Sequence, residues 1–140
     1  MAKIPELQEK YQALEKELKF RGEEAVDAEC LLAFEYEYSD QPCQVSMDTD
    51  EFTALCPWTA LPDYVTLKIT YTPSDRVIEL KSLKYYLLSF RDVSIVQEHA
   101  ANRVLNDLVA VCKPLRMTLT LDYNVRGGLH TTVTVPYEKP

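Results

Sequence analysis

The residues best suited to chemistry are a thiol and a carboxyl group seven positions apart, Cys56 and Asp63. A proline follows Cys56 and biases the cysteine toward extended backbone, as at the end of a strand or loop. A free thiol with a pKa near ~8.5 is mostly protonated at neutral pH, so a nucleophile needs positive or hydrogen-bonding surroundings. Asp63 needs burial to hold a proton at pH 7. A structural cysteine and a turn aspartate explain the same residues.

A second set of groups is cationic. Lys81 and Lys84 fall near the start of a predicted helix, and Arg126 precedes Gly127 in a predicted loop. In a chain of net charge −7, a local cluster of this kind can bind phosphate groups, and glycine lets the backbone approach a ligand closely. A solvated helix face and an ordinary hairpin turn are the alternative explanations.

A further carboxylate, Glu98, falls near the start of another predicted helix, where the helix dipole favours negative charge. Helix capping is sufficient to explain such a residue. If buried, the carboxylate can instead accept the paired N–H donors at the edge of a guanine-like ring.

The elements that must position these groups follow from apolar periodicity. Apolar residues at alternating steps of three and four predict an amphipathic helix over roughly 4–20, ended by Arg21-Gly22. The predicted extended segments are 28–38, 42–53, 65–71 and the stretches around 77–78, 117–121 and 133–135, and the predicted later helices are 79–91 and 97–112. Their buried residues are predicted to be Leu80, Leu83, Leu87 and Phe90 in the first helix and Ala101, Val104, Leu105 and Leu108 in the second.

Two consecutive helices between runs of strands are typical of an α+β protein, in which an antiparallel sheet carries the helices on one face. We therefore expect residues 1–25 to form an N-terminal helical extension and residues 26–140 to form a single domain. The extension carries no residue suited to catalysis, and we expect it to pack on the domain or on a neighbouring subunit.

Composition excludes several classes of protein. The 140 residues have the length of one domain, and an apolar content of 46% is typical of a folded core. The net charge of −7 argues against generic nucleic-acid binding, and no apolar run approaches the ~20 residues of a membrane span. Because the start has no signal-peptide pattern, we expect a soluble cytoplasmic protein.

The four cysteines do not predict a metal site. None lies in a CxxC pair, and neither histidine has ligand spacing relative to them, so we expect no bound metal. Cys30 and Cys112 stand in apolar contexts typical of small core residues. Cys43 follows a predicted turn and carries no functional signal.

Several motifs, in their order along the chain, resemble one enzyme family. They are Glu51-Phe-Thr, Cys56-Pro, Pro62-Asp63, Glu79-Leu-Lys-Ser-Leu-Lys-Tyr-Tyr86, Ser89-Phe-Arg91, Glu98, Asp107-Leu108 and Arg126-Gly-Gly128. Together they are similar to the NADPH-dependent 7-cyano-7-deazaguanine reductases of queuosine biosynthesis, a tRNA-modification pathway, in their short single-module form. The resemblance covers roughly residues 43–136.

The resemblance implies the tunnelling fold, in which an antiparallel sheet carries two helices and subunits join edge to edge into a ring. Two rings, expected to be pentameric, stack on each other, and the active sites lie between subunits of this homo-oligomer. Cys56 and Lys81 of one chain therefore need not face the same site.

The resemblance also implies roles for individual residues. Cys56 is expected to add to the nitrile carbon as a nucleophile, giving a covalent thioimide, and Asp63 is expected to supply the proton. The residues expected to bind the deazapurine substrate are Ile78, Glu79, Leu80, Gln97 and Glu98. The residues expected to bind NADPH are Lys81, Ser82, Lys84, Arg126 and Gly127.

Two positions depart from the family's pattern. Gln97 stands where the family usually has histidine, and Gln97 can donate a hydrogen bond but cannot carry a proton. Val96 stands where an aromatic residue is common, which removes one stacking surface.

Two rival functions are an amidinotransferase relative that modifies the same nitrile within archaeal tRNA, and a non-catalytic ring protein that binds purines. The intact helix motif and the negative net charge argue against the amidinotransferase function. The presence of both Cys56 and Asp63 argues against a non-catalytic protein.

Overall fold

The computed structural model describes residues 3–17 and 21–140. In chain order the elements are α1 (Ile4–Glu17), the 3-10 turns η1 (Glu23–Ala25) and η2 (Ala28–Cys30), β1 (Ala33–Glu35), β2 (Val45–Leu55), β3 (Pro62–Thr72), β4 (Arg76–Ile78), α2 (Leu80–Leu88), α3 (Gln97–Cys112), β5 (Arg116–Tyr123) and β6 (Thr132–Glu138). The last part of the predicted first helix, residues 18–20, lies outside the described residues.

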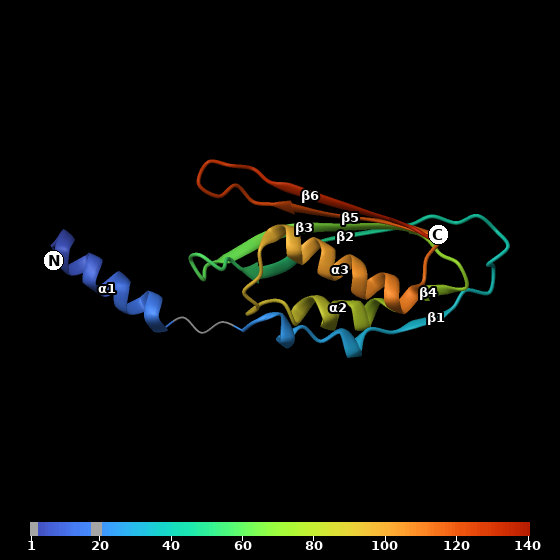
Figure 1. Cartoon of the computed structure of the whole chain (residues 1–140), viewed down its shortest axis with the longest axis horizontal. Helices are drawn as coiled ribbons and strands as arrows, with labels where there is room; N and C mark the ends of the chain where they lie inside the picture. The colour runs from blue at the N-terminus through green and yellow to red at the C-terminus, as the bar shows by residue number, and fades with distance from the viewer. Residues whose placement is uncertain (1–2, 18–20) are drawn as a thin grey trace.

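A four-stranded antiparallel sheet forms the base of the domain, with the strand order β2-β3-β5-β6. The helices α2 and α3 lie along one side of this sheet (Figure 1). β1 and β4 pair separately as a short antiparallel ladder. Buried and exposed residues alternate along β3 and β5, as one apolar face of each strand requires. The predicted α+β layer, with two consecutive helices on one face, is confirmed.

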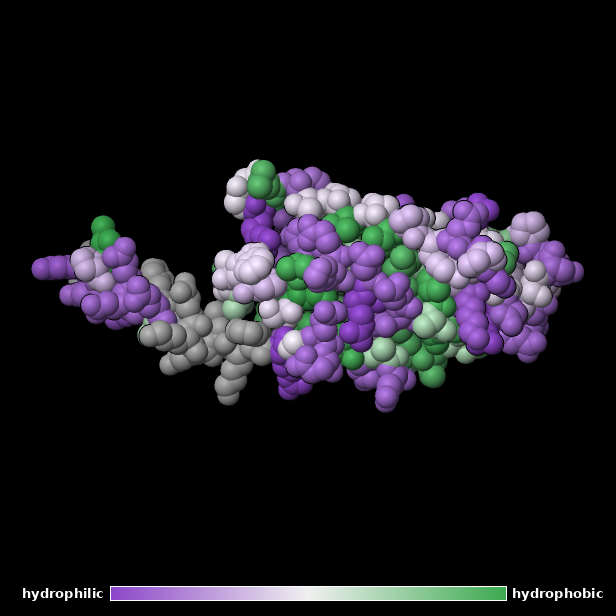
Figure 2. Space-filling view, in the orientation of Figure 1, coloured by the Kyte–Doolittle hydropathy of each residue, from purple (hydrophilic) through white to green (hydrophobic). Residues whose placement is uncertain are grey.

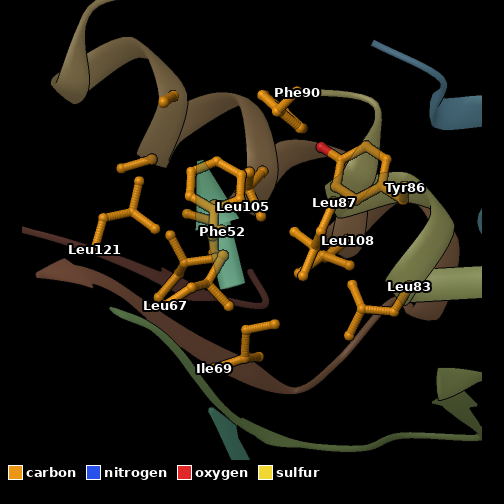
Figure 3. Close-up of a cluster of buried hydrophobic side chains, with 14 of the residues drawn as sticks. Phe52, Leu67, Ile69, Leu83, Tyr86, Leu87, Phe90, Leu105, Leu108 and Leu121 are labelled. Carbon is orange, nitrogen blue, oxygen red and sulfur yellow. The ribbon is translucent and has the colours of Figure 1, made fainter. Parts of the chain in front are cut away.

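The hydrophobic core lies between the helices and the sheet (Figure 3). Leu67 and Ile69 of β3 face this core from the sheet, and Leu105 and Leu108 of α3 cover them. The ring of Phe90 meets Phe52 and Tyr86 edge-on, at centroid distances of 5.2 and 5.4 Å. All four residues that were predicted to be buried in α3 are buried.

α2 is shorter than predicted and turns one of its predicted core residues outward. Leu83 and Leu87 are buried within it, and Phe90 just beyond it, but Leu80 is 62% exposed, so the prediction for Leu80 was wrong. Leu80 is the first helical residue and borders an apolar hollow beside β2 instead of the packed interior. The helix ends at Leu88, and the hydroxyl of the next residue, Ser89, donates to the carbonyl of Tyr86 at 2.6 Å.

The segment predicted to be extended over 28–38 is extended only in part. Asp27 accepts a hydrogen bond from the backbone N–H of Cys30 at 3.2 Å, which closes a 3-10 turn before β1 begins. Asx side chains compete in this way with strand pairing, and the alternation pattern does not register the competition.

α1 stands apart from the sheet domain (Figure 1). Its apolar residues Ile4, Leu7 and Leu14 are exposed. Among the described residues, no helix combines the length and the apolar character that crossing a membrane requires.

A buried polar network ties α2 to α3. The hydroxyl of Tyr86, fully buried, donates to the carboxylate of Asp107 at 2.7 Å, and Nε of Arg103 donates to the same oxygen at 2.8 Å. Burial and the neighbouring carboxylate raise the pKa of Tyr86 well above its ordinary value, so the phenol stays a donor.

We expect Tyr86→Phe to lower the free energy of unfolding by about 1–2 kcal/mol, because a partly buried carboxylate loses one of its donors. Urea unfolding at fixed protein concentration measures the change. The matched control is Tyr85→Phe, at an exposed neighbour on the same helix, which should leave the unfolding midpoint in place. Equal midpoints for both variants would contradict a stabilising role for the network.

Candidate active site

The loop from Cys56 to Leu61 is held closed by its own backbone. The N–H of Cys56 donates to the carbonyl of Leu61 at 2.9 Å, and the N–H of Ala60 donates to the carbonyl of Cys56 at 2.8 Å. Ala60 adopts a left-handed conformation with φ of 57° to make this turn. Cys56 is left 2% exposed at the end of β2, so its thiol has a fixed position.

The surroundings of Cys56 favour its thiolate. Burial works against ionisation, but hydrogen bonds from the Thr59 side chain and from the backbone N–H groups of Trp58 and Thr59 outweigh it, helped by the charge of Arg126. The net effect holds the pKa of Cys56 below its ordinary value. A lowered thiol pKa is typical of reactive cysteines and not of structural ones.

Asp63 is placed beside this thiol by strand register. Asp63 pairs with Ala54 across β2 and β3, and Leu55, the neighbour of Cys56, pairs with Pro62. The Asp63 side chain is 10% exposed, and burial raises the pKa of its carboxyl group. Nη1 of Arg126 donates to both carboxylate oxygens, at 2.9 and 3.0 Å, and partly opposes that rise.

Arg126 reaches Asp63 from the hairpin between β5 and β6. Gly127 and Gly128 follow Arg126 with φ of 59° and 78°, a region that favours glycine, and no atom lies within 4 Å of where a Cβ would stand. The two glycines therefore serve the turn itself and leave open space around it.

A cavity of about 320 Å³ opens next to these groups. Its lining residues are Pro57, Trp58, Asp63, Ile95, Val96, Gln97, Glu98 and Arg126. The volume falls in the range of small-molecule sites. Sequence reasoning missed Trp58 and Ile95. The position of Trp58, two residues after Cys56 in the same loop, was the available signal.

Gln97 and Glu98 enter this cavity from the start of α3. Val96 precedes the helix without a side-chain cap, and Glu98 lies in the first turn. Gln97 is half-buried and Glu98 is exposed. Within the part of the chain that the structure describes, no hydrogen bond or ion pair engages the Glu98 carboxylate, so it is available to a ligand.

The remaining predicted site residues gather at the start of α2. The carboxylate of Glu79 accepts from the backbone N–H groups of Lys81 and Ser82 at 2.8 and 2.7 Å, and these bonds lower its pKa. The buried hydroxyl of Ser82 donates to the carbonyl of Glu79 and accepts from the N–H of Leu32. Ile78 is buried and donates its N–H to the hydroxyl of Tyr71. Within one chain, the hydrogen bonds of Glu79 and Ser82 therefore stabilise the N-terminal end of α2.

Lys81 and Lys84 are exposed and lie one helical turn apart on α2. Lys84 forms an ion pair with Glu51 of β2. Two exposed ammonium groups at this spacing fit a polyanionic ligand such as a dinucleotide phosphate. The backbone donors at this helix start are already taken by Glu79, so the lysine side chains must supply the positive charge.

The structure therefore brings one half of the predicted site together and keeps the other half away. The β2–β3 loop, the β5–β6 hairpin loop and the start of α3 lie at one end of the domain (Figure 1), and they carry Cys56, Asp63, Gln97, Glu98, Arg126 and Gly127. Ile78, Glu79, Leu80, Lys81, Ser82 and Lys84 lie toward the opposite end, where α2 begins. None of these six residues lines the cavity that Asp63, Gln97, Glu98 and Arg126 line, so within one chain the two groups do not share that cavity.

The other cysteines behave differently from Cys56. Cys112 is fully buried, and burial raises its pKa to about 12, as expected of a core residue. Cys30 is half-buried and packs against the core, and its thiol donates to the carbonyl of Asp27 at 3.1 Å. In residues 3–17 and 21–140, no cluster of potential ligands could hold a metal ion.

A thiol of lowered pKa and a carboxyl group of raised pKa near one cavity are features typical of enzymes that use a cysteine nucleophile with an acid partner. The model of the QueF-like protein family matches residues 62–140. The chain belongs to this family.

Curated relatives extend the match over nearly the whole chain. A protein of Caldicellulosiruptor bescii named NADPH-dependent 7-cyano-7-deazaguanine reductase is 45% identical over 133 residues, 95% of this chain and 100% of that one. A protein of the same name from Thermoanaerobacter pseudethanolicus is 48% identical over 118 residues, 84% of this chain and 89% of that one.

A solved structure shares the fold. The apo form of the archaeosine synthase QueF-Like aligns with a TM-score of 0.66 and 21% identity, over 71% of this chain and 98% of that one.

We expect Arg126→Gln to move the ionisation of Cys56 to higher pH. The arginine charge lowers the pKa of Cys56, so its removal raises that pKa and leaves less thiolate at neutral pH. The rate of iodoacetamide alkylation at the Cys56 peptide, followed against pH by mass spectrometry, reports the shift. Lys68→Gln, at an exposed cation elsewhere on β3, is the control. An unchanged pH midpoint in Arg126→Gln would show that Arg126 does not act on the thiol.

Proposed function

We propose that this chain is an NADPH-dependent nitrile oxidoreductase that converts 7-cyano-7-deazaguanine to its 7-aminomethyl form in queuosine biosynthesis. The observation that carries the proposal is the identity of 45–48% to relatives of that name across most of the chain. The Cys56–Asp63 pair beside a cavity is the chemistry that such a reaction needs.

Cys56 and Asp63 perform the covalent step. The thiolate of Cys56 adds to the nitrile carbon and forms a C–S bond, and the displaced π electrons move to nitrogen. Asp63 gives its proton to that nitrogen, which yields a neutral thioimide. The raised pKa of Asp63 and the lowered pKa of Cys56 support these roles, because each shift favours the protonation state that the step needs.

The cofactor and the substrate use the remaining residues. When bound, NADPH supplies hydride, two equivalents for a nitrile reduced to an amine. Lys81, Lys84 and Arg126 neutralise its phosphates, with Ser82 ordering the helix start and Gly127 allowing close approach. Glu98 accepts the N–H donors at the ring edge of the deazapurine, and Gln97 adds a hydrogen bond without carrying a proton. The remaining substrate contacts are Ile78, Glu79 and Leu80.

We propose that complete sites form between copies of the chain, in a tunnelling-fold assembly of two stacked pentameric rings. The separation of the two groups of site residues supports this arrangement, because a second chain must bring its α2 to the cavity of the first. β2 and β6 are the edge strands of the described sheet and are the surfaces available for edge-to-edge joining. The visible surface is mostly polar, with apolar patches among the polar residues (Figure 2).

Within this assembly, residues 26–140 form the catalytic domain and residues 1–25 an extension. The exposed apolar stripe of α1, with Ile4, Leu7 and Leu14, supports packing against the outside of the ring.

We expect the protein to oxidise two NADPH for each 7-cyano-7-deazaguanine, and Cys56→Ala to abolish that oxidation. The loss of the nucleophile leaves the nitrile unactivated toward hydride. Absorbance of NADPH and mass spectrometry of the Cys56 peptide measure the two steps separately. A Cys56 adduct without NADPH oxidation would favour the amidinotransferase reaction. Substrate binding without adduct or turnover would favour a purine-binding protein.

A mixing experiment tests the shared site. Cys56→Ala and Lys81→Ala should each be inactive or strongly impaired alone, and co-assembly in equal amounts should restore activity. Random mixing unites an intact Cys56 and an intact Lys81 in about a quarter of the interfaces. Asp63→Asn mixed with Cys56→Ala is the control, since both residues belong to one chain's cavity and no functional site can form. No recovery in the first mixture, with mixed assemblies shown by mass, would refute sites shared between chains.

A further inference from the structure

The cavity next to Cys56 displays the only tryptophan of the chain. Trp58 is 81% exposed, although it lines the same cavity as Asp63 and Glu98. An indole is large and mostly apolar, and its exposure beside a polar cavity is characteristic of a binding surface.

The backbone of the loop that carries this indole is held by hydrogen bonds. Two backbone hydrogen bonds, Cys56 to Leu61 and Ala60 to Cys56, close the loop around Trp58. The backbone N–H of Trp58 itself is directed at the Cys56 sulfur. A loop backbone held in this way loses little conformational entropy when a ligand binds, so a contact made by its side chain contributes more to affinity.

The other cavity-lining residues offer no comparable surface. Ile95 and Val96 are aliphatic, Pro57 is small, and the remaining four lining residues are polar or charged. Val96 precedes α3 directly, so the start of this helix brings no aromatic ring to the cavity. Among the described lining residues, Trp58 is the single aromatic group.

We propose that the indole of Trp58 stacks on the flat bicyclic ring of the deazapurine substrate and thereby holds the nitrile at Cys56. The proposal rests on the proposed function. It gives the substrate three separate contacts: Glu98 at the ring edge, Trp58 on the ring face and Cys56 at the nitrile. The edge contact alone leaves the ring free to tilt, and the stacked indole removes that freedom.

The test uses the Cys56→Ala protein, in which the substrate binds without reacting. Calorimetric titration with 7-cyano-7-deazaguanine gives the dissociation constant for this parent and for the added changes Trp58→Leu and Trp58→Phe. We expect Trp58→Leu to weaken binding by about 5- to 150-fold, the range for loss of a base–aromatic stack, and Trp58→Phe to restore most of it. Indole fluorescence of the parent should change on binding, because Trp58 is the sole tryptophan.

The matched control is Tyr64→Leu, at an exposed aromatic residue of β3 that does not line the cavity, and it should bind like the parent. Equal affinity of Trp58→Leu and the parent would overturn the stacking role while leaving the reductase proposal intact. A loss in Trp58→Leu that Trp58→Phe does not recover would also overturn it, since any flat ring should stack. No binding by the parent would instead refute the proposed substrate.

Discussion

The antiparallel ladder between β2 and β3 is the constraint on which the site depends. Its register opposes Ala54 to Asp63 and Leu55 to Pro62, so the residue after β2 and the start of β3 meet at one end of the sheet. A slip of one residue would turn Asp63 to the other face and Val65 out of the core. The core residues of β3, buried under α2 and α3, make such a slip costly, and packing thereby fixes the spacing between thiol and carboxyl group.

Burial raises the pKa of both groups, but their net pKa shifts are opposite because their partners differ. Asp63 has one cationic partner, and its desolvation prevails, so its pKa rises. Cys56 has neutral donors from its own loop as well as the more distant Arg126, and together they overcome desolvation. Compared with the same groups in water, the thiol therefore has a larger thiolate fraction at a given pH, and the carboxyl group retains more of the proton that it must donate. The charge of Arg126 lowers the pKa of both groups, although for Cys56 its effect is smaller than that of the loop donors.

Local patterns predicted the helices and strands well, and the contacts between them less well. The limits of α3 and the buried residues of α3 followed from apolar spacing, because a helix that packs on a sheet must show that period. The exposure of Leu80 did not, since it depends on where the helix meets the edge of the interface. The pairing of Arg126 with Asp63 joins residues 63 positions apart, and no local signal encodes it.

The residues of the candidate site were likewise predicted better than their arrangement in space. Cys56, Asp63, Gln97 and Glu98 were selected by motif. Asp63, Gln97 and Glu98 line one cavity, and Cys56 directly precedes Pro57 of the same lining. The distance between that cavity and the start of α2 follows from the direction in which α2 runs along the sheet, a property of topology and not of composition. Trp58 was not predicted as a site residue, because a tryptophan two positions after a cysteine is not a known sequence motif.

The left-handed backbone of Ala60, in the loop after Cys56, lowers the stability of the folded chain. An alanine in this conformation costs about 1–2 kcal/mol compared with a right-handed one, and glycine would avoid most of it. The turn nevertheless keeps the N–H groups of Trp58 and Thr59 aimed at the sulfur. The strained backbone of this loop is therefore maintained by the packing of β2 against β3. If that packing were looser, the loop would relax and the Cys56 sulfur would lose its hydrogen-bond donors.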